Sequence, residues 1–194
     1  MRIDHVILAT ADLDAAAQRL EREHALRAVA GGRHEGLGTH NRIVPLGGGY
    51  LELLAVADPE EAARSELGRA VTGRIAAAGD GLMGWAVAVE DVAPVAERLG
   101  TETTTIGRSG LFAHLTGVAE AMAEPCLPFF IARGPGVPDP AASGAAGGIA
   151  WIEVAGEEAR LHAWLGDDRG LPVRVVPGDP AVRAVGIGEH VVLR

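Results

Sequence analysis

The feature that most constrains the fold is one order of secondary-structure signals that starts three times along the chain. Each start is a short run of apolar and β-branched residues, at 3–9, 84–89 and 149–154, followed by a segment with helical spacing. Further strand-like runs follow each helical segment. Repetition of this kind predicts an α+β protein assembled from similar modules.

Turn and capping signals divide the chain into five segments. Residues 1–57 have the pattern of a complete β-α-β-β-β module, in which three glycines at 47–49 form a hairpin turn. An aspartate followed by a proline predicts a connecting helix over 58–79. The other segments are a second βαβββ module over 80–133, a Gly/Pro-rich connection over 134–148, and a third, partial βαβ-type module over 149–194.

Two such modules have a simple way to bury their apolar surface. An antiparallel sheet with a helix on its outer face leaves the other face free. Two of these sheets facing each other close a concave, part-barrel cavity of a size that suits a small molecule. The exposed strands at the module edges also favour self-association, so we expect a homodimer.

Charge and hydropathy narrow the partners and the compartment. The chain has 17 basic and 26 acidic residues, a net charge of −9, and no cluster of basic residues. This charge repels phosphate backbones and anionic lipids, which argues against nucleic acid and membrane partners. No apolar run approaches the ~20 residues of a membrane span. The first five residues lack the apolar core of a signal peptide, so we expect a cytoplasmic protein.

Three short motifs, in their order and spacing, resemble a module of the vicinal-oxygen-chelate (VOC) superfamily. They are Ile3-Asp4-His5-Val6, the Gly-Thr-His-Asn loop that ends at 41, and Tyr50-Leu51-Glu52-Leu53. The loop over 32–41 resembles the glyoxalase-like branch more narrowly. The resemblance is good over 1–56, fair over 82–133 and vague beyond 148. It implies the glyoxalase/bleomycin-resistance/dihydroxybiphenyl dioxygenase-like fold, with paired βαβββ modules around a U-shaped cavity.

The resemblance also implies a metal site. Many members use a divalent ion to chelate vicinal oxygens of the substrate, and His5 and Glu52 match a histidine and a glutamate ligand of that site. Trp85 and Phe130 or its neighbours stand where the second histidine and glutamate would be, and an indole cannot replace an imidazole. The set is therefore half present, and His114, His34 or His40 would have to complete it. The ion could be Zn, Ni, Mn or Fe.

Other polar residues near these motifs are candidates for catalysis or ligand binding. Glu52 and His40 are the candidate acid/base groups. Arg42 could clamp a carboxylate, because its guanidinium matches that geometry. The remaining candidate contacts with a ligand are Asn41, His34, Trp85 and Phe130. Each has a structural alternative: a hydrogen-bonded pair at a sheet face, a glycine-rich turn, or an aromatic residue that fills the core.

Two functional interpretations follow, and both stay open at this level. The first is a metal-assisted enzyme of lyase or isomerase type acting on a small, oxygen-containing organic molecule. The second is a metal-free protein that binds or sequesters a small molecule, with Trp85 and Phe130 in place of the missing ligands. We rank the enzyme first, and a scaffold that only dimerises third.

Overall fold

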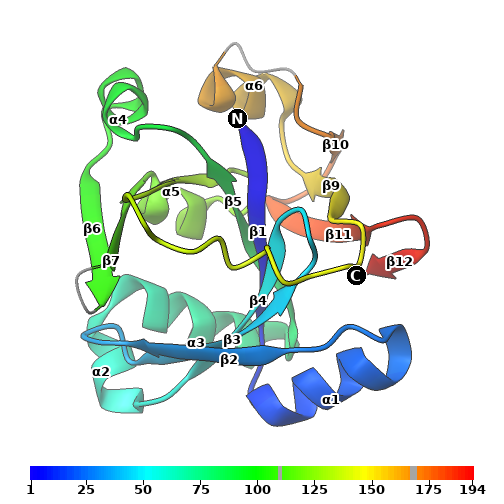
Figure 1. Cartoon of the computed structure of the whole chain (residues 1–194). Helices are drawn as coiled ribbons and strands as arrows, with labels where there is room; N and C mark the ends of the chain where they lie inside the picture. Colours follow the sequence, from blue (N-terminus) through cyan, green and yellow to red (C-terminus); the bar gives the residue numbers. More distant parts are fainter. Residues whose placement is uncertain (109–110, 167–169) are drawn as a thin grey trace.

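The computed structural model describes residues 1–108, 111–166 and 170–194, and Figure 1 shows how their elements are arranged. The first module contains β1 (Arg2–Ala9), α1 (Leu13–His24), β2 (Val29–His34), β3 (Thr39–Pro45) and β4 (Tyr50–Val56). The helices α2 (Pro59–Arg64) and α3 (Glu66–Ala78) connect it to the second module. That module contains β5 (Gly81–Ala88), α4 (Ala93–Leu99), β6 (Thr103–Arg108), β7 (Leu111–Thr116), α5 (Val118–Ala123) and β8 (Phe129–Arg133).

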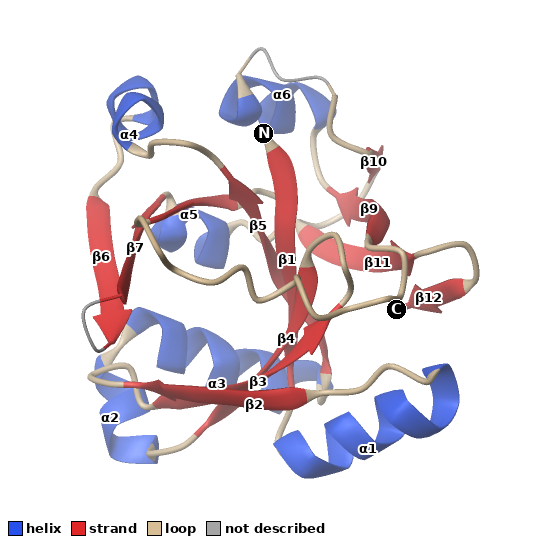
Figure 2. Cartoon of the chain, viewed as in Figure 1, coloured by secondary structure: helices blue, strands red, loops and turns tan. Residues whose placement is uncertain are grey.

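The two modules form one eight-stranded sheet in the order β2-β3-β4-β1-β5-β8-β7-β6. Strand β1 is parallel to β4, β5 is parallel to β8, and the modules meet where β1 and β5 pair in antiparallel fashion. The same strand order therefore runs outward from the centre in both halves. Figure 2 shows that the sheet is strongly curled, which confirms the predicted α+β class with a concave sheet.

The third segment builds a separate sheet. It contains β9 (Ile149–Ala155), α6 (Glu158–Leu165), β10 (Val173–Val176), β11 (Ala181–Ile187) and β12 (Val191–Leu193), with strand order β10-β9-β11-β12. Here the first strand, β9, pairs in parallel with the second strand, β10, whereas β1 and β5 pair in parallel with the last strands of their modules. Strand β11 contacts β5, and the rings of Trp164 and Phe130 lie 6.3 Å apart. The segment thus covers the convex face of the large sheet.

The connecting helix differs from the single helix that the sequence predicts. It breaks at Ser65, whose backbone is extended (φ −107°, ψ 149°) and which ends α2 and begins α3. The Ser65 hydroxyl accepts a hydrogen bond from the Gly68 N–H and donates one to the Leu37 carbonyl. A serine can satisfy the first free N–H groups of a new helix, and this local bond competes with continuation of the old one.

Two apolar clusters mark the two faces of the large sheet. The convex cluster contains Val6 and Leu8 of β1 with Trp85 and Phe130, and α1 and α6 pack on it. The concave cluster contains the alternate β1 residues, Ile7 and Ala9, together with α3 and α5 residues such as Val71 and Ala121. Because α3 and α5 fill one end of the concavity, the remaining space lies toward the beginning of β1. Within the described residues, no helix has the length and apolarity to cross a membrane.

Candidate functional site

A β-bulge at the start of β1 places two consecutive side chains in the candidate site. Ile3 pairs with Val87 and His5 with Ala86, so Asp4 is an extra residue without a partner on β5. Consecutive side chains of a regular strand point to opposite faces, whereas a bulge re-aims one of them. As a result, the side chains of Asp4 and His5 meet, with His5 Nδ1 2.7 Å from Asp4 Oδ1.

The imidazole of His5 is held on three sides. It is 3% exposed, its ring stacks on Tyr50 at a centroid distance of 4.6 Å, and the edge of Phe129 lies 5.4 Å away. Because an ionised carboxylate only accepts hydrogen bonds, the proton on Nδ1 is donated to Asp4. In the neutral ring this leaves Nε2 with a free lone pair, directed toward Glu52.

Asp4 is buried and is paired with an arginine from the other half of the sheet. Arg133 Nη1 and Nη2 donate to Asp4 Oδ2 and Oδ1 at 2.5 and 2.8 Å. Burial opposes ionisation of Asp4, but the hydrogen bonds from Arg133 and His5 prevail and hold the pKa of Asp4 well below its usual range. Burial also acts against the charge of Arg133, yet the Asp4 carboxylate raises its pKa. The pair is therefore ionised throughout the neutral range.

Glu52 is held at one oxygen and open at the other. Asn41 Nδ2 donates to Glu52 Oε1 at 2.6 Å, and His34 Nε2 lies 3.7 Å from the same oxygen. Glu52 Oε2 faces His5 Nε2 at 3.6 Å, which is longer than a hydrogen bond. His5 Nε2 and Glu52 Oε2 thus face each other, and neither atom is engaged in a hydrogen bond with a described residue.

Asn41 and His34 form the wall behind Glu52. Asn41 Oδ1 accepts the Gly32 N–H at 2.8 Å, and Asn41 Nδ2 lies 3.2 Å from His34 Nε2. His34 Nδ1 in turn lies 2.9 Å from the Thr39 hydroxyl. Gly31 of β2 allows this arrangement, because a Cβ there would lie 2.0 Å from Asn41 Oδ1. This glycine therefore has a packing role beside Asn41.

Burial and charge also affect Tyr50. Desolvation is the largest influence, and the carboxylates of Glu52 and Asp4 add to it, so the pKa of Tyr50 lies well above its usual range. Its hydroxyl accepts a hydrogen bond from Arg133 Nη2 at 3.3 Å. Tyr50 therefore acts as a neutral platform for the His5 ring at neutral pH.

Two of the predicted site residues lie on the opposite face. His40 and Arg42 alternate with Asn41 along β3, and Arg42 forms an ion pair with Asp14 of α1. Because successive side chains of a strand point to opposite faces, His40 and Arg42 lie on the convex face when Asn41 lies on the concave face. This corrects the expectation that His40 is an acid/base group beside Glu52 and that Arg42 clamps a ligand there.

The three predicted residues of the second half also point away from His5. His114 pairs with Ala132 of the convex cluster, and its Nδ1 lies 2.9 Å from the hydroxyl of Thr105. Trp85 and Phe130 are fully buried in the convex cluster, where the Trp85 indole donates to the Cys126 carbonyl at 3.1 Å. His114 therefore lies on the convex face, opposite to His5 and Glu52, and the two aromatic residues fill the core.

The strand register identifies the true counterparts of His5 and Glu52 in the second half. On β1 and β4, His5 pairs with Tyr50 and Ile7 with Glu52; on β5 and β8, Ala86 pairs with Phe129 and Ala88 with Ile131. The counterparts are therefore Ala86 and Ile131, each one residue beyond the Trp85 and Phe130 that the sequence suggested.

The residues present do not fit the four-ligand metal site of the family. Ala86 and Ile131 have no lone pair to offer, and Asn41 occupies the outer oxygen of Glu52. In the described parts of the chain, no side-chain nitrogen or oxygen that is completely shielded from solvent lacks a hydrogen-bond partner. Among these same residues, no three His, Cys, Asp or Glu side chains are placed to hold one ion. A catalytic zinc site, which keeps one position open, typically has three protein ligands.

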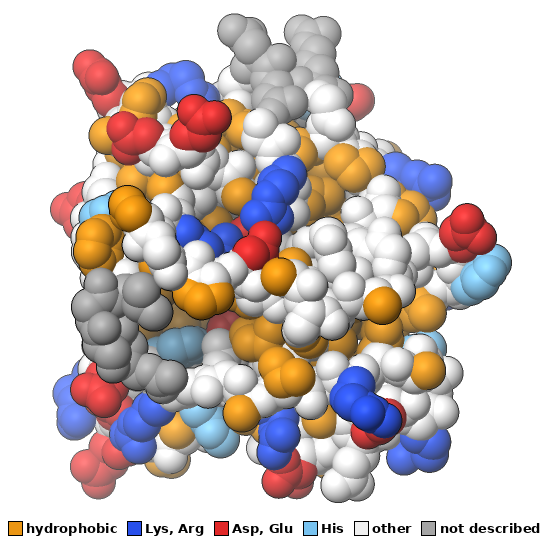
Figure 3. All heavy atoms as spheres, in the orientation of Figure 1, with side chains coloured by type: hydrophobic (Ala, Val, Ile, Leu, Met, Phe, Trp, Pro, Cys, Tyr) orange, Lys and Arg blue, Asp and Glu red, His pale blue; other side chains and the backbone are white. Residues whose placement is uncertain are grey.

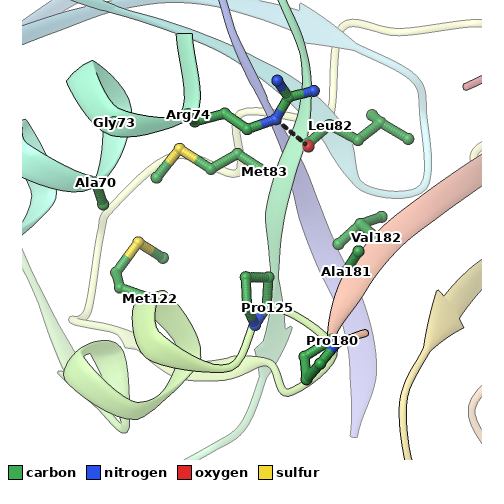
Figure 4. Close-up of a pocket in the computed structure, with 10 residues that line it drawn as sticks. All are labelled: Ala70, Gly73, Arg74, Leu82, Met83, Met122, Pro125, Pro180, Ala181 and Val182. Carbon is green, nitrogen blue, oxygen red and sulfur yellow. Dashed lines mark hydrogen bonds between the residues drawn. The ribbon is translucent and has the colours of Figure 1, made fainter. Parts of the chain in front are cut away.

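Figure 3 shows that the surface is hollowed between β2 and β3 and the β6–β7 hairpin, with histidine and acidic side chains in the recess. A cavity of about 470 Å³ lies next to the Asp4–Arg133 pair and is lined in part by Arg2, Ile131, Arg133 and Asp139. A second cavity, of about 290 Å³, lies between α3, α5 and β11 (Figure 4). None of the candidate residues lines that second cavity.

Sequence reasoning missed four residues that shape the site: Asp4, Tyr50, Phe129 and Arg133. Asp4 was hidden because a bulge leaves no mark in a short apolar strand. Tyr50, Phe129 and Arg133 were detectable in principle. Residues two apart in a strand lie on the same face. Tyr50 therefore shares a face with Glu52 on β4, and Phe129 and Arg133 share a face with Ile131, the counterpart of Glu52, on β8.

This arrangement, two βαβββ halves around a concave face with a histidine and a glutamate on it, defines a VOC-type protein. The family model described as a glyoxalase-like domain matches residues 3–168, and the chain belongs to that family. A search of curated proteins finds no match.

Solved structures share the fold at low sequence identity. A hypothetical protein from Staphylococcus aureus is 16% identical with a TM-score of 0.66, covering 93% of this chain and 88% of its own. Methylmalonyl-CoA epimerase from Mycobacterium tuberculosis is 18% identical with a TM-score of 0.51, covering 73% and 91%. A variant of the Streptomyces coelicolor epimerase in complex with 2-nitronate-propionyl-CoA is 18% identical with a TM-score of 0.53, covering 71% and 99%.

Proposed function

We propose that the protein binds a small, oxygen-containing organic molecule on the concave face and moves a proton on it with His5 and Glu52, in a lyase or isomerase type of reaction. The observation that carries this proposal is the pair of unoccupied atoms, His5 Nε2 and Glu52 Oε2, 3.6 Å apart. Each is backed by a partner that holds its far side, Asp4 for His5 and Asn41 for Glu52.

The two groups have complementary roles. The Glu52 carboxylate can accept a proton from a carbon next to a carbonyl group, and the hydrogen bond from Asn41 fixes its direction. His5 Nε2 can accept or return a proton, because Asp4 stabilises the imidazolium that forms when it does. Positioned acid/base groups of this kind typically contribute about 10²–10⁴-fold to a rate. A buried carboxylate orients the histidine ring in the same way in hydrolytic triads.

The apolar half of the face suggests the shape of the substrate. Phe129 and Ile131 line the side opposite Glu52, so the oxygen-bearing end of a ligand would face the first half and an apolar group the second. Two of the structural neighbours are epimerases, a class of enzyme whose reaction inverts a carbon centre. Proton removal and return at carbon is the step that such a reaction shares with our proposal.

We propose that this chemistry does not depend on a bound metal. The argument is the donor set: two of the four family positions are Ala86 and Ile131. His5, Glu52 and His34 could still gather a divalent ion if Asn41 moved away from Glu52. Metal analysis of the purified protein, and of protein loaded with Zn²⁺, Ni²⁺, Mn²⁺ or Fe²⁺, decides between the two. One ion per chain, lost in Glu52→Gln, would favour the metal-assisted version.

The direct test is hydrogen exchange at carbon. We would incubate the protein in D₂O with a panel of small 2-oxo acids, hydroxyketones and acyl thioesters, and follow loss of the C–H signal by ¹H NMR. His5→Gln and Glu52→Gln should each lower the exchange rate at least ~100-fold. The matched controls are His190→Gln and Glu189→Gln, whose side chains are 88% and 90% exposed. Equal exchange in wild type and site variants would contradict the proposal.

A binding protein without turnover is the second candidate. It is favoured by the depth of the site, because His5 and Glu52 are almost completely buried by Tyr50, Phe129 and Asn41. In that case the panel would show saturable binding in ligand-observed NMR, with no deuterium incorporation in the wild type. The same two variants would then weaken binding and leave the C–H signals unchanged.

We also propose that the protein is a cytoplasmic homodimer. Strands β2 and β6 are the edges of the large sheet, and β6 is exposed over residues 103–107. Edge strands offer unpaired backbone groups for association. Light scattering at micromolar concentration should give twice the chain mass of 20.0 kDa. A monomer at that concentration would contradict the dimer.

A further inference from the structure

We propose that Arg133 is the positioning residue of the site: one guanidinium from the second half of the sheet fixes both groups that hold the His5 ring, Asp4 and Tyr50. The proposal deepens the proposed function and rests on it, since it names what keeps the acid/base pair in place. Arg133 does not touch the atoms at which we expect proton transfer, His5 Nε2 and Glu52 Oε2.

The first support is the geometry of the Arg133 contacts. Both terminal nitrogens bind the Asp4 carboxylate, at 2.5 and 2.8 Å, and Nη2 also donates to the Tyr50 hydroxyl at 3.3 Å. The guanidinium carbon lies 5.9 Å from the centroid of the Tyr50 ring. A two-point contact with a carboxylate sets its orientation as well as its charge, which a single ammonium cannot do.

The second support is that the same two groups determine the state of His5. Asp4 Oδ1 accepts hydrogen bonds from both Arg133 Nη2 and His5 Nδ1, and Tyr50 stacks on the His5 ring at an interplanar angle of 21°. With the carboxylate fixed as an acceptor, the proton of the neutral ring stays on Nδ1 and Nε2 stays free. Arg133 therefore acts on the tautomer of His5 through Asp4 and on its tilt through Tyr50.

The third support is the charge balance of a buried site. The side chain of Asp4 is 1% exposed and that of Arg133 14% exposed. A buried carboxylate without its cation is costly, so Asp4 keeps its place beside His5 while Arg133 is bound to it. The second half of the sheet, which lacks the family ligands, thus supplies the counter-charge that keeps the His5–Asp4 pair in one state.

The test reads the tautomer of His5 directly and needs no substrate. In ¹⁵N-labelled protein, long-range ¹H–¹⁵N spectra distinguish a protonated from an unprotonated ring nitrogen, and His5→Gln assigns the signal among the seven histidines. Wild type should show a protonated Nδ1 and an unprotonated Nε2. Arg133→Met, which keeps length and removes the charge, should lose this signature. Arg133→Lys, which keeps a charge but only one contact point, should restore it in part.

The matched control is Arg2→Met. Arg2 lies 3.9 Å from the same Asp4 carboxylate but is exposed and bonded to Asp139, so its loss should leave the His5 signature unchanged. If Arg133→Met fails to fold, the double variant Asp4→Asn with Arg133→Met leaves no buried charge unpaired, and we expect it to fold with the signature lost. A folded Arg133→Met or double variant with the wild-type His5 signature would overturn the proposal.

The two proposals can fail separately. In the exchange assay, we expect Arg133→Met to lower the exchange rate by less than the His5→Gln substitution does, with recovery toward wild type in Arg133→Lys. If wild type exchanges no substrate but the His5 signature responds as described, the proposed function fails and the role of Arg133 stands. If exchange depends on His5 but the signature does not respond to Arg133, the role of Arg133 fails and the proposed function stands.

Discussion

The two halves of the large sheet have the same strand order and opposite character on their concave face. The first half presents His5 and Glu52, and the second presents Ala86 and Ile131 at the corresponding positions. Among its described residues, the second half reaches the polar side through Arg133, at the last position of β8. One architecture can therefore divide its labour: one half holds the reactive groups, and the other supplies an apolar wall and a counter-charge.

The convex faces of the halves differ as well. Strand β4 of the first half packs aliphatic residues, Leu51 and Leu53, against the adjacent helix α1. The second half packs Trp85 and Phe130 against the third segment, where Trp164 donates to the Pro128 carbonyl at 2.7 Å. Trp85 and Phe130 thus lie where the third segment covers the convex face of the sheet, which explains why they do not line the concave face.

The largest effect should come from placing a carboxylate in the apolar half. Ile131→Glu puts the counterpart of Glu52 into a buried position next to Phe129 and Leu115, with no Asn41 to receive it. The two arginines that line the adjacent cavity are already paired, Arg133 with Asp4 and Arg2 with Asp139. An unpaired buried charge costs about 3–5 kcal/mol. Urea denaturation should show this loss, while the control Ile131→Leu should cost less than about 1.5 kcal/mol. Equal stability of Ile131→Glu and wild type would mean that the two halves are not different environments.

The next largest effect tests the face assigned to Trp85. Trp85→Phe keeps most of the packing but leaves the buried Cys126 carbonyl without its donor, for a loss of about 2 kcal/mol. The lower stability should appear as a lower denaturation midpoint. Under conditions where the variant is folded, carbon–deuterium exchange should match that of wild type. A selective loss of exchange without a change in stability would place Trp85 at the cavity instead.

The sequence was most informative where local signals and long-range pairing agree. The strand and helix order of both modules, the glycine turn at 47–49 and the strand runs of the third segment follow from alternation and capping, except for helix α5 between β7 and β8, which the sequence did not predict. The pair His5 and Glu52 came from the family resemblance, and the register brings them within 3.6 Å. These features need no knowledge of which face each strand turns inward.

What could not be predicted depends on register and irregularity. A one-residue shift moves every side chain of a strand to the other face, so Phe130 was preferred where Ile131 faces the site. The bulge at Asp4 is accompanied by a contact with the distant Arg133, and the break at Ser65 combines its local bond to Gly68 with a bond to the distant Leu37. Because Arg133 and Leu37 lie far away in the sequence, the local pattern does not show which of several possible irregularities forms.

A smaller effect concerns the tie between the halves at Asp80. Its carboxylate accepts hydrogen bonds from Thr10 and Ala11 and pairs with Arg19. Partial burial opposes ionisation, but these bonds hold the pKa of Asp80 below its usual value. Its contribution is therefore present above the unfolded pKa of about 3.9 and is lost as pH falls through the lower folded value.

We expect Asp80→Asn to cost about 1 kcal/mol at pH 7, a modest figure because the side chain is 31% exposed. Denaturation midpoints measured from about pH 7 down to about pH 2 should show the two proteins converging below about pH 4. Glu189→Gln, at a fully solvated position, is the control. A difference that grows as the pH falls would reverse the sign of the argument.

The smallest effect is expected for Arg42→Ala, which is best compared with a substitution of its neighbour on β3, Asn41. Arg42 faces outward to Asp14, and an exposed pair of this kind is worth about 0–1 kcal/mol, so Arg42→Ala should barely change stability or exchange. Asn41→Ala, one position earlier, leaves Glu52 Oε1 without its hydrogen-bond donor and removes the acceptor of the Gly32 N–H. It should cost about 1–3 kcal/mol and lower exchange with it. If Arg42→Ala were the more harmful change in the exchange assay, the inward face of β3 would have to be reassigned, and with it the first half of the site.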